Sequence, residues 1–131
     1  MNNYTDITES CRYLLNNCPE AEPYLSYINS RINQEMQEKF SFGYFPNNNN
    51  IKLLTSLVGE KTLEEAGLVY TKETQDSVRI DSATISFFNH HPLILPYRDV
   101  YGEIVAIVGR TLLNDQERSR EKIVKYKNTV F

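Results

Sequence analysis

Apolar and polar positions follow a helical period through the first third of the chain. Apolar residues spaced three or four apart predict an amphipathic helix over 5–17. Two prolines then interrupt the pattern, which continues as a second helix over 24–32 and a short third one around Met36 and Phe40. The segment FSFGYFPNNNN that follows is rich in Gly, Pro and Asn, a composition typical of a loop. The N-terminal part is therefore predicted to be helical.

The patterning changes from helical to extended in the middle of the chain. Apolar positions within 51–58 resume the helical period, and Thr62 and Glu65 have the spacing of a capping box that begins a further helical turn. A strand is predicted at 68–71. Residues 72–91 are polar and weakly patterned, so they predict a loop with a short strand near 78–80.

The segment LILPYRDVYGEIVAIVGRTLL predicts two strands joined by a tight turn. Asp99 and Gly102 suit the first and last positions of a four-residue turn. Such a turn pairs Arg98 with Glu103, Leu95 with Ala106, and Leu93 with Val108. Both faces of 104–108 are apolar, so we expect this strand to be covered on both sides. A last helix is predicted over 115–124.

Composition is that of an ordinary globular domain, with 131 residues, 40% hydrophobic and 24% charged. No apolar run is long enough to span a membrane, and the N-terminus has no signal-peptide pattern. Cys11 and Cys18 are predicted to be reduced core cysteines. The net charge of −3 alone argues against a nucleic-acid binder. However, residues 1–66 hold five Lys/Arg against nine Asp/Glu, whereas residues 98–127 hold seven against five, so positive charge gathers near the C-terminus.

The sequence contains no complete motif for a phosphate-binding loop, a metal site or a catalytic triad. VGEKT at 58–62 resembles a phosphate-binding loop only in part, because the upstream glycine is absent. His90 and His91 have no Cys or paired acid at metal-ligand spacing, so a surface loop is predicted for them. No catalytic triad and no acidic cluster suited to magnesium occurs in the sequence.

Cationic residues remain as the candidate functional groups. Arg98 has a structural explanation, an ion pair with Glu103, beside a binding one. Arg110 has no acid partner in the predicted register, which favours binding over plain solvation. In the tail, a helix to Lys125 would put Arg118, Lys122 and Lys125 on one face. Cations there and at Lys127 could neutralise phosphates, while Tyr126 could stack on a base; a solvated helix face is the alternative.

Four segments in order resemble DnaG-type bacterial and phage DNA primases. PYRDVYGEIVAIVGR resembles the family's Pro-x-Arg-Asp…Gly-Gly-Arg motif, and FSFGYFPNN its Phe-x-x-Gly-Tyr-Ala-Pro segment. LEEAGLV is similar to a Leu-Glu-Glu-Ala-Gly-Leu stretch, and KYKNT to Lys-Tyr-Leu-Asn-Ser. Together these matches cover residues 24–128, nearly the whole chain.

The resemblance implies the N-terminal subdomain of the primase RNA polymerase core. The implied fold is α+β, with N-terminal helices packed on a small, mainly antiparallel sheet in a single domain over 1–131, helical over about 5–66, with strands and the basic tail over about 67–131. Its implied role is to guide single-stranded template DNA during RNA primer synthesis. The resemblance implies that Arg110 and Lys125 are template-binding positions and that Lys39 lies close to another basic template-binding position. Within the Lys-Tyr segment, Tyr126, Lys127 and Asn128 are further candidates.

Some features of the family are missing from the 131 residues. Val108 replaces the first glycine of the Gly-Gly-Arg motif, and neither the zinc ribbon nor the TOPRIM domain that holds Mg²⁺ in the family is present. We therefore expect a fragment or a remnant that is not catalytic alone, contains no cofactor, and works with a TOPRIM domain or chain and with the replicative helicase in the cytoplasm of a bacterial or phage-infected cell. The alternative is a stand-alone, phage-type interaction module that mimics primase and engages replication proteins.

Overall fold

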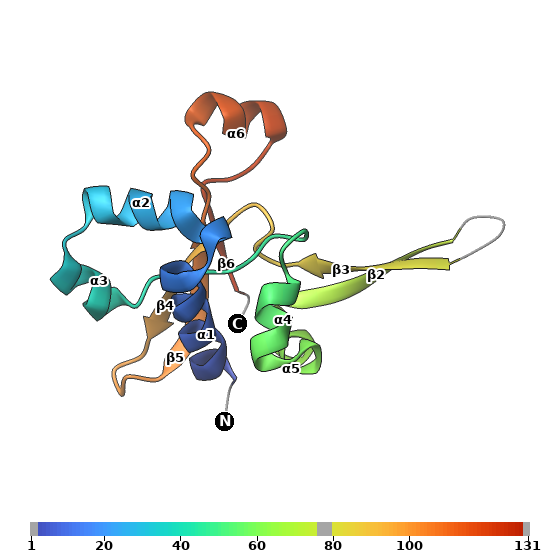
Figure 1. Cartoon of the computed structure of the whole chain (residues 1–131), viewed down its shortest axis with the longest axis horizontal. Coiled ribbons are helices and arrows are strands. Elements are labelled where there is room, and N and C mark those ends of the chain that lie inside the picture. Colours follow the sequence, from blue (N-terminus) through green and yellow to red (C-terminus); the bar gives the residue numbers. More distant parts are fainter. Residues whose placement is uncertain (1–2, 76–79, 130–131) are drawn as a thin grey trace.

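Helices from the N-terminal half pack against a small antiparallel sheet built mostly by the C-terminal half (Figure 1). The computed structural model describes residues 3–75 and 80–129. The helical elements are α1 (Tyr4–Asn17), a 3₁₀ turn (Pro19–Ala21), α2 (Glu22–Arg31), α3 (Gln34–Phe40), α4 (Lys52–Val58), α5 (Glu60–Glu65) and α6 (Asp115–Glu121). The strands are β1 (Gly43–Tyr44), β2 (Val69–Gln75), β3 (Ile80–Ser86), β4 (Leu93–Arg98), β5 (Ile104–Arg110) and β6 (Tyr126–Asn128). The predicted α+β class is confirmed.

The main core lies between α1, α4, α5 and one face of the sheet. The apolar stripe predicted for the first helix is buried there, and Ile7 and Cys11 have no exposed surface. Ile94 of β4 and Ile107 of β5 meet these helices from the sheet. Because successive side chains of a strand point to opposite faces, Leu95 and Arg110 project from the other face of the sheet. None of the helices in the described part of the chain has the length and apolar character needed to cross a bilayer.

The central sheet has the strand order β1-β4-β5-β6, with antiparallel pairing throughout. The β4–β5 hairpin predicted from the sequence is present, but its predicted register is wrong by two residues. Leu95 pairs with Val108, and Leu93 pairs with Arg110. Val105 is 41% exposed, so the expectation that both faces of this strand are covered holds only in part.

Two local features cause the change of register. The turn closes through a hydrogen bond from the Gly102 amide to the Asp99 carbonyl, and Gly102 adopts φ 85°, which adds one residue to the loop. A bulge between Tyr97 and Arg98 adds the second shift. The turn alone shifts Arg98 by one residue, to Ile104, whereas the pairs beyond the bulge are shifted by two, which keeps their predicted and observed partners on the same face.

A two-stranded ribbon replaces most of the loop predicted at 72–91. β2 and β3 pair from Val69 with Ser86 to Gln75 with Ile80, and they extend away from the rest of the molecule (Figure 1). The predicted strand near 78–80 falls largely outside the described residues, apart from Ile80 at the start of β3. The sequence did not predict the ribbon, because its polar residues Thr71, Lys72 and Glu73 are exposed and show no apolar alternation.

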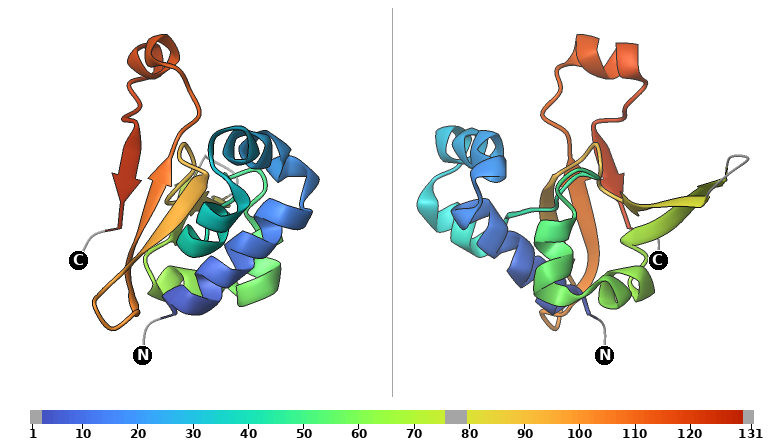
Figure 2. Two further views of the ribbon diagram at one scale, coloured as in Figure 1. Left: turned by 90° about the vertical axis from the view of Figure 1, so that its left-hand side faces the viewer. Right: turned by 45° about the vertical axis from the view of Figure 1, so that its right-hand side comes forward.

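Two helix boundaries also differ from the predictions. Helix α5 begins at Glu60 after Gly59, so Thr62 lies inside the helix and does not cap it. Helix α6 ends at Glu121, because Lys122 adopts the left-handed conformation that ends a helix. Figure 2 shows α6 standing beyond the ends of β5 and β6. The chain then returns as an edge strand.

Candidate nucleic-acid interface

Arg110 occupies the last position of β5, where two neighbouring strands fix its direction. Its partners are Leu93 on β4 and Tyr126 on β6, and residues opposite each other in antiparallel strands share a face. Gly109, one residue earlier, faces the other way. A Cβ atom there would lie 2.4 Å from Phe88 Cδ1, so only glycine lets the strand approach Phe88 this closely. The Gly-Arg pair thus combines close packing on one face with a cation on the other.

Five side chains form an alternating series around this arginine. The Arg110 guanidinium lies 5.0 Å from the ring centre of Tyr27 and 5.9 Å from that of Tyr126. Beyond Tyr27 lies the Arg31 guanidinium at 4.6 Å, and beyond Tyr126 the Lys125 ammonium at 5.8 Å. We call this series, Arg31–Tyr27–Arg110–Tyr126–Lys125, the cation–aromatic stripe. Each contact is worth roughly 0.5–1 kcal/mol where exposed.

The arginines of the stripe keep their hydrogen-bonding capacity. A guanidinium that stacks on a ring uses its flat face and leaves its N–H groups, which lie in the plane, able to bind an oxyanion. In the described part of the chain, Arg31 and Arg110 make no ion pair and no side-chain hydrogen bond. The stripe therefore presents cations that no carboxylate neutralises.

The C-terminal half of the stripe is held in place by a buried histidine. His91 is 5% exposed, in contrast to the surface position predicted for it, and its Nε2 donates to the Val124 carbonyl at 2.7 Å. Burial, aided by the nearby Lys127 and His90, lowers the pKa of His91 below its ordinary value of 6.5. A second bond, from the Thr111 amide to the Lys125 carbonyl at 3.2 Å, ties the same segment to the end of β5.

Lys127, predicted to act beside Arg110, lies on the opposite face of the sheet. It pairs with Gly109, its Nζ donates to the Phe87 carbonyl at 2.9 Å, and the ammonium lies 4.0 Å from the Phe87 ring centre. The two-residue period of a strand separates it from Tyr126. Asn128, which pairs with Val108, is exposed on the face of Tyr126.

The remaining predicted cations are dispersed. Arg118 is ion-paired with Asp115 within α6, and Lys122 ends that helix, so the helical face predicted for Arg118, Lys122 and Lys125 does not form. Arg98 donates to the Gly102 carbonyl at 2.9 Å and supports the hairpin turn, without the predicted pairing with Glu103.

Lys39 lies on α3, with its ammonium 5.9 Å from the Phe40 ring centre. It belongs to the helical part of the chain and is not a member of the cation–aromatic stripe.

Sequence reasoning missed Tyr27 and Arg31. Their four-residue spacing on a helix was visible in the sequence and predicts stacked neighbours, but nothing local connects them with Arg110, more than seventy residues away. No group of three or more His, Cys, Asp or Glu side chains within the described ranges could hold a metal ion.

Comparisons with known proteins agree with the motifs. The family "DNA primase catalytic core, N-terminal domain" matches residues 12–130. The chain is similar in structure to a DNA primase domain from Pseudomonas aeruginosa, with a TM-score of 0.62 and 25% identity over 95% of this chain and 36% of that one. The E. coli primase catalytic core has a TM-score of 0.63 and 22% identity, over 95% and 36% of the two chains. A DnaG primase catalytic domain bound to single-stranded DNA has a TM-score of 0.58 and 21% identity, over 97% and 38%. The chain thus spans little more than a third of these primases, and no curated protein sequence matches it.

Proposed function

Because the chain belongs to the family of DNA primase catalytic core N-terminal domains, we propose that it binds single-stranded template DNA along the cation–aromatic stripe. The observation that carries the proposal is the geometry of Arg110, whose guanidinium lies over the rings of Tyr27 and Tyr126, 5.0 Å and 5.9 Å from their centres, and makes no hydrogen bond or ion pair with the described residues. The DNA in one structurally similar primase domain, which was solved with a single strand bound, supports this choice of ligand.

The order of side chains in the stripe suits an unpaired strand. Along a single strand, one base projects from each sugar that joins two successive phosphates. The stripe offers cations with aromatic rings between them, which suits this alternation of charge and ring. Rings can stack on bases only when the bases are unpaired, so a duplex could use the cations alone. Three cations that each neutralise one phosphate would make log Kd change with log salt by a slope of about 2.

In this proposal, the chemical step of primer synthesis takes place on another domain or chain. Magnesium ions would supply the charge stabilisation of nucleotidyl transfer, but the described residues include no cluster of metal ligands. The described side chains therefore do not fit that metal. We assign magnesium and the chemical step to a TOPRIM domain or chain, and the role of this domain is to hold and orient the template.

Fluorescence anisotropy with a labelled single strand of mixed sequence, measured over a salt series, tests the proposal. Arg110→Ala should weaken binding about equally for all sequences and lower the salt slope by about 0.7. The matched control is Arg12→Ala, which removes an exposed arginine on α1 outside the stripe. Lys127→Ala probes the opposite face and should change affinity less than Arg110→Ala. Affinity that does not vary with salt, or equal losses in Arg110→Ala and Arg12→Ala, would refute the proposal.

One observation favours a second candidate, a protein-interaction module that engages replication proteins such as the replicative helicase. Residues 1–66 carry five Lys/Arg against nine Asp/Glu, a balance that repels nucleic acid. A pull-down of purified helicase separates the candidates. Capture that persists in Arg110→Ala, together with no detectable binding of single strands, would favour the interaction module.

A further inference from the structure

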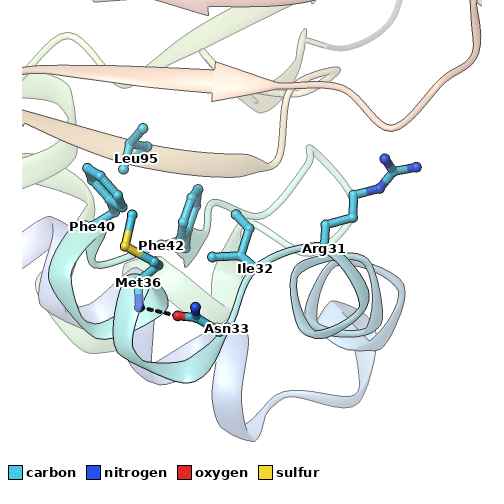
Figure 3. Close-up of a pocket in the computed structure, with 7 residues that line it drawn as sticks. All are labelled: Arg31, Ile32, Asn33, Met36, Phe40, Phe42 and Leu95. Atoms are coloured by element: carbon cyan, nitrogen blue, oxygen red, sulfur yellow. Dashed lines mark hydrogen bonds between the residues drawn. The ribbon is translucent and has the colours of Figure 1, made fainter.

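An open apolar groove lies between α2, α3 and β4. It encloses about 400 Å³, and Figure 3 shows its apolar side chains turned toward one another from α3, β4 and the segments that follow α2 and α3. These side chains are Ile32, Met36, Phe40, Phe42 and Leu95. The groove lies on the sheet face from which Leu95 and Arg110 project.

The side chains that line the groove leave part of their apolar surface exposed to solvent. Helix α3 buries none of its residues, and Met36 and Phe40 are 38% and 40% exposed. Phe40 meets Phe42 edge to face, with ring centres 6.5 Å apart, so part of the Phe40 ring remains open to water. An aromatic or apolar group of a ligand would remove this surface from water.

The polar groups around the groove are hydrogen-bond donors and cations. Asn33 Oδ1 accepts from the Met36 amide at 2.9 Å, so the Asn33 Nδ2 group, which donates to no other group in the described part of the chain, is available to a ligand. The Arg31 guanidinium lies at one end of the groove and Phe40 at the other (Figure 3), and the Lys39 ammonium lies 5.9 Å from the Phe40 ring centre. The matching ligand has a flat apolar body, hydrogen-bond acceptors, and negative charge on both sides.

The groove is continuous with the cation–aromatic stripe through one residue. Arg31 lines the groove and also stacks on Tyr27 at 4.6 Å. A strand with one phosphate at Arg31 and another near Lys39 would carry the intervening base over the opening. An apolar protein segment would fill the groove but would leave both cations unmatched, so the charges favour nucleic acid.

We infer that this groove seats one unstacked nucleobase of the bound strand, with preference for thymine over adenine. The inference rests on the proposed function, because the strand must first lie along the stripe. Thymine presents carbonyl acceptors to Asn33 Nδ2 and a methyl group to the apolar walls. Adenine can accept at a ring nitrogen, but it has no methyl group for the apolar walls, and its amino donor meets an Asn33 Oδ1 that already accepts from the Met36 amide.

Competition anisotropy with three oligonucleotides of equal length tests the inference: oligo-dT, oligo-dA and a fully abasic strand. The full chain should bind oligo-dT more tightly than either of the others. Phe40→Ala should weaken oligo-dT binding about five- to tenfold and leave abasic binding unchanged, because stacking on one ring is lost. Met36→Ala should also weaken oligo-dT binding and leave abasic binding unchanged. Because alanine is a good helix former, this second variant tests the groove even if Phe40→Ala disturbs α3. The control is Leu57→Ala, a 48% exposed residue on α4 away from the groove.

The two proposals fail in different ways. If Arg110→Ala weakens every strand but Phe40→Ala and Met36→Ala change oligo-dT and abasic affinity equally, the groove inference is overturned and the proposed function stands. If no strand binds, both are overturned. If purified helicase binds, loses affinity in Phe40→Ala and is not displaced by oligo-dT, the groove is a protein-docking site and the inference is wrong.

Discussion

Replacing Gly109 with alanine should destabilise the fold by about 2 kcal/mol. The new methyl carbon would lie 2.4 Å from Phe88 Cδ1 and 2.6 Å from the His91 carbonyl oxygen. Phe88 cannot retreat easily, because it is fully buried and packs edge to face against Phe45 at 5.2 Å. Overpacking of this kind costs about 1–3 kcal/mol, and two close contacts place this site near the upper end. Alanine also lowers the conformational entropy of the unfolded chain, which offsets about 0.4–1 kcal/mol of this loss of stability.

Urea unfolding followed by circular dichroism measures the effect. For a slope of about 1.5 kcal/mol per molar urea, the midpoint should fall by about 1–1.5 M. Val105→Ala on the same strand, where the residue is 41% exposed, is the control and should shift the midpoint less. Phe88→Ala removes both ring atoms near the new methyl, Cδ1 and Cε1, so the double variant should lose less stability than the sum of the single ones. A Gly109→Ala midpoint at or above that of the parent chain would refute the packing argument.

Two further predictions concern the segment that presents Tyr126. Because the folded chain lowers the pKa of His91, the unfolded chain takes up the proton first as the pH falls, so stability should be full above about pH 6.5 and decline below it. His91→Gln should reduce that decline more than His90→Gln does, in urea midpoints measured from pH 8 to 5. Thr129→Val should lower the stability of the fold by about 1–3 kcal/mol, because the buried Ile107 amide loses its acceptor, Thr129 Oγ1, at 3.0 Å. Amide hydrogen exchange at Ile107 should then accelerate. An unchanged unfolding midpoint would contradict this role of the Thr129 hydroxyl.

Local sequence rules predicted some members of the cation–aromatic stripe and misplaced other cations. Arg110 was singled out because the predicted register left it without an acid, and that conclusion holds although its partner is Leu93 and not a residue near His91. Lys125 and Tyr126 were expected on a helix and a tail, yet they join the stripe because β6 pairs with β5. Lys127 was expected beside them, but strand alternation directs it to Phe87.

The motifs of the sequence indicated the family of the chain. The sequence by itself also determined the amphipathic face of α1 and the existence of the β4–β5 hairpin. These properties depend on residues near one another in sequence, where apolar period and turn residues suffice. Tertiary structure alone decided the pairing of β6 with β5 and the meeting of Tyr27 with Arg110. These depend on contacts between distant segments, whose free energies come from packing and charge and leave no periodic trace along the chain.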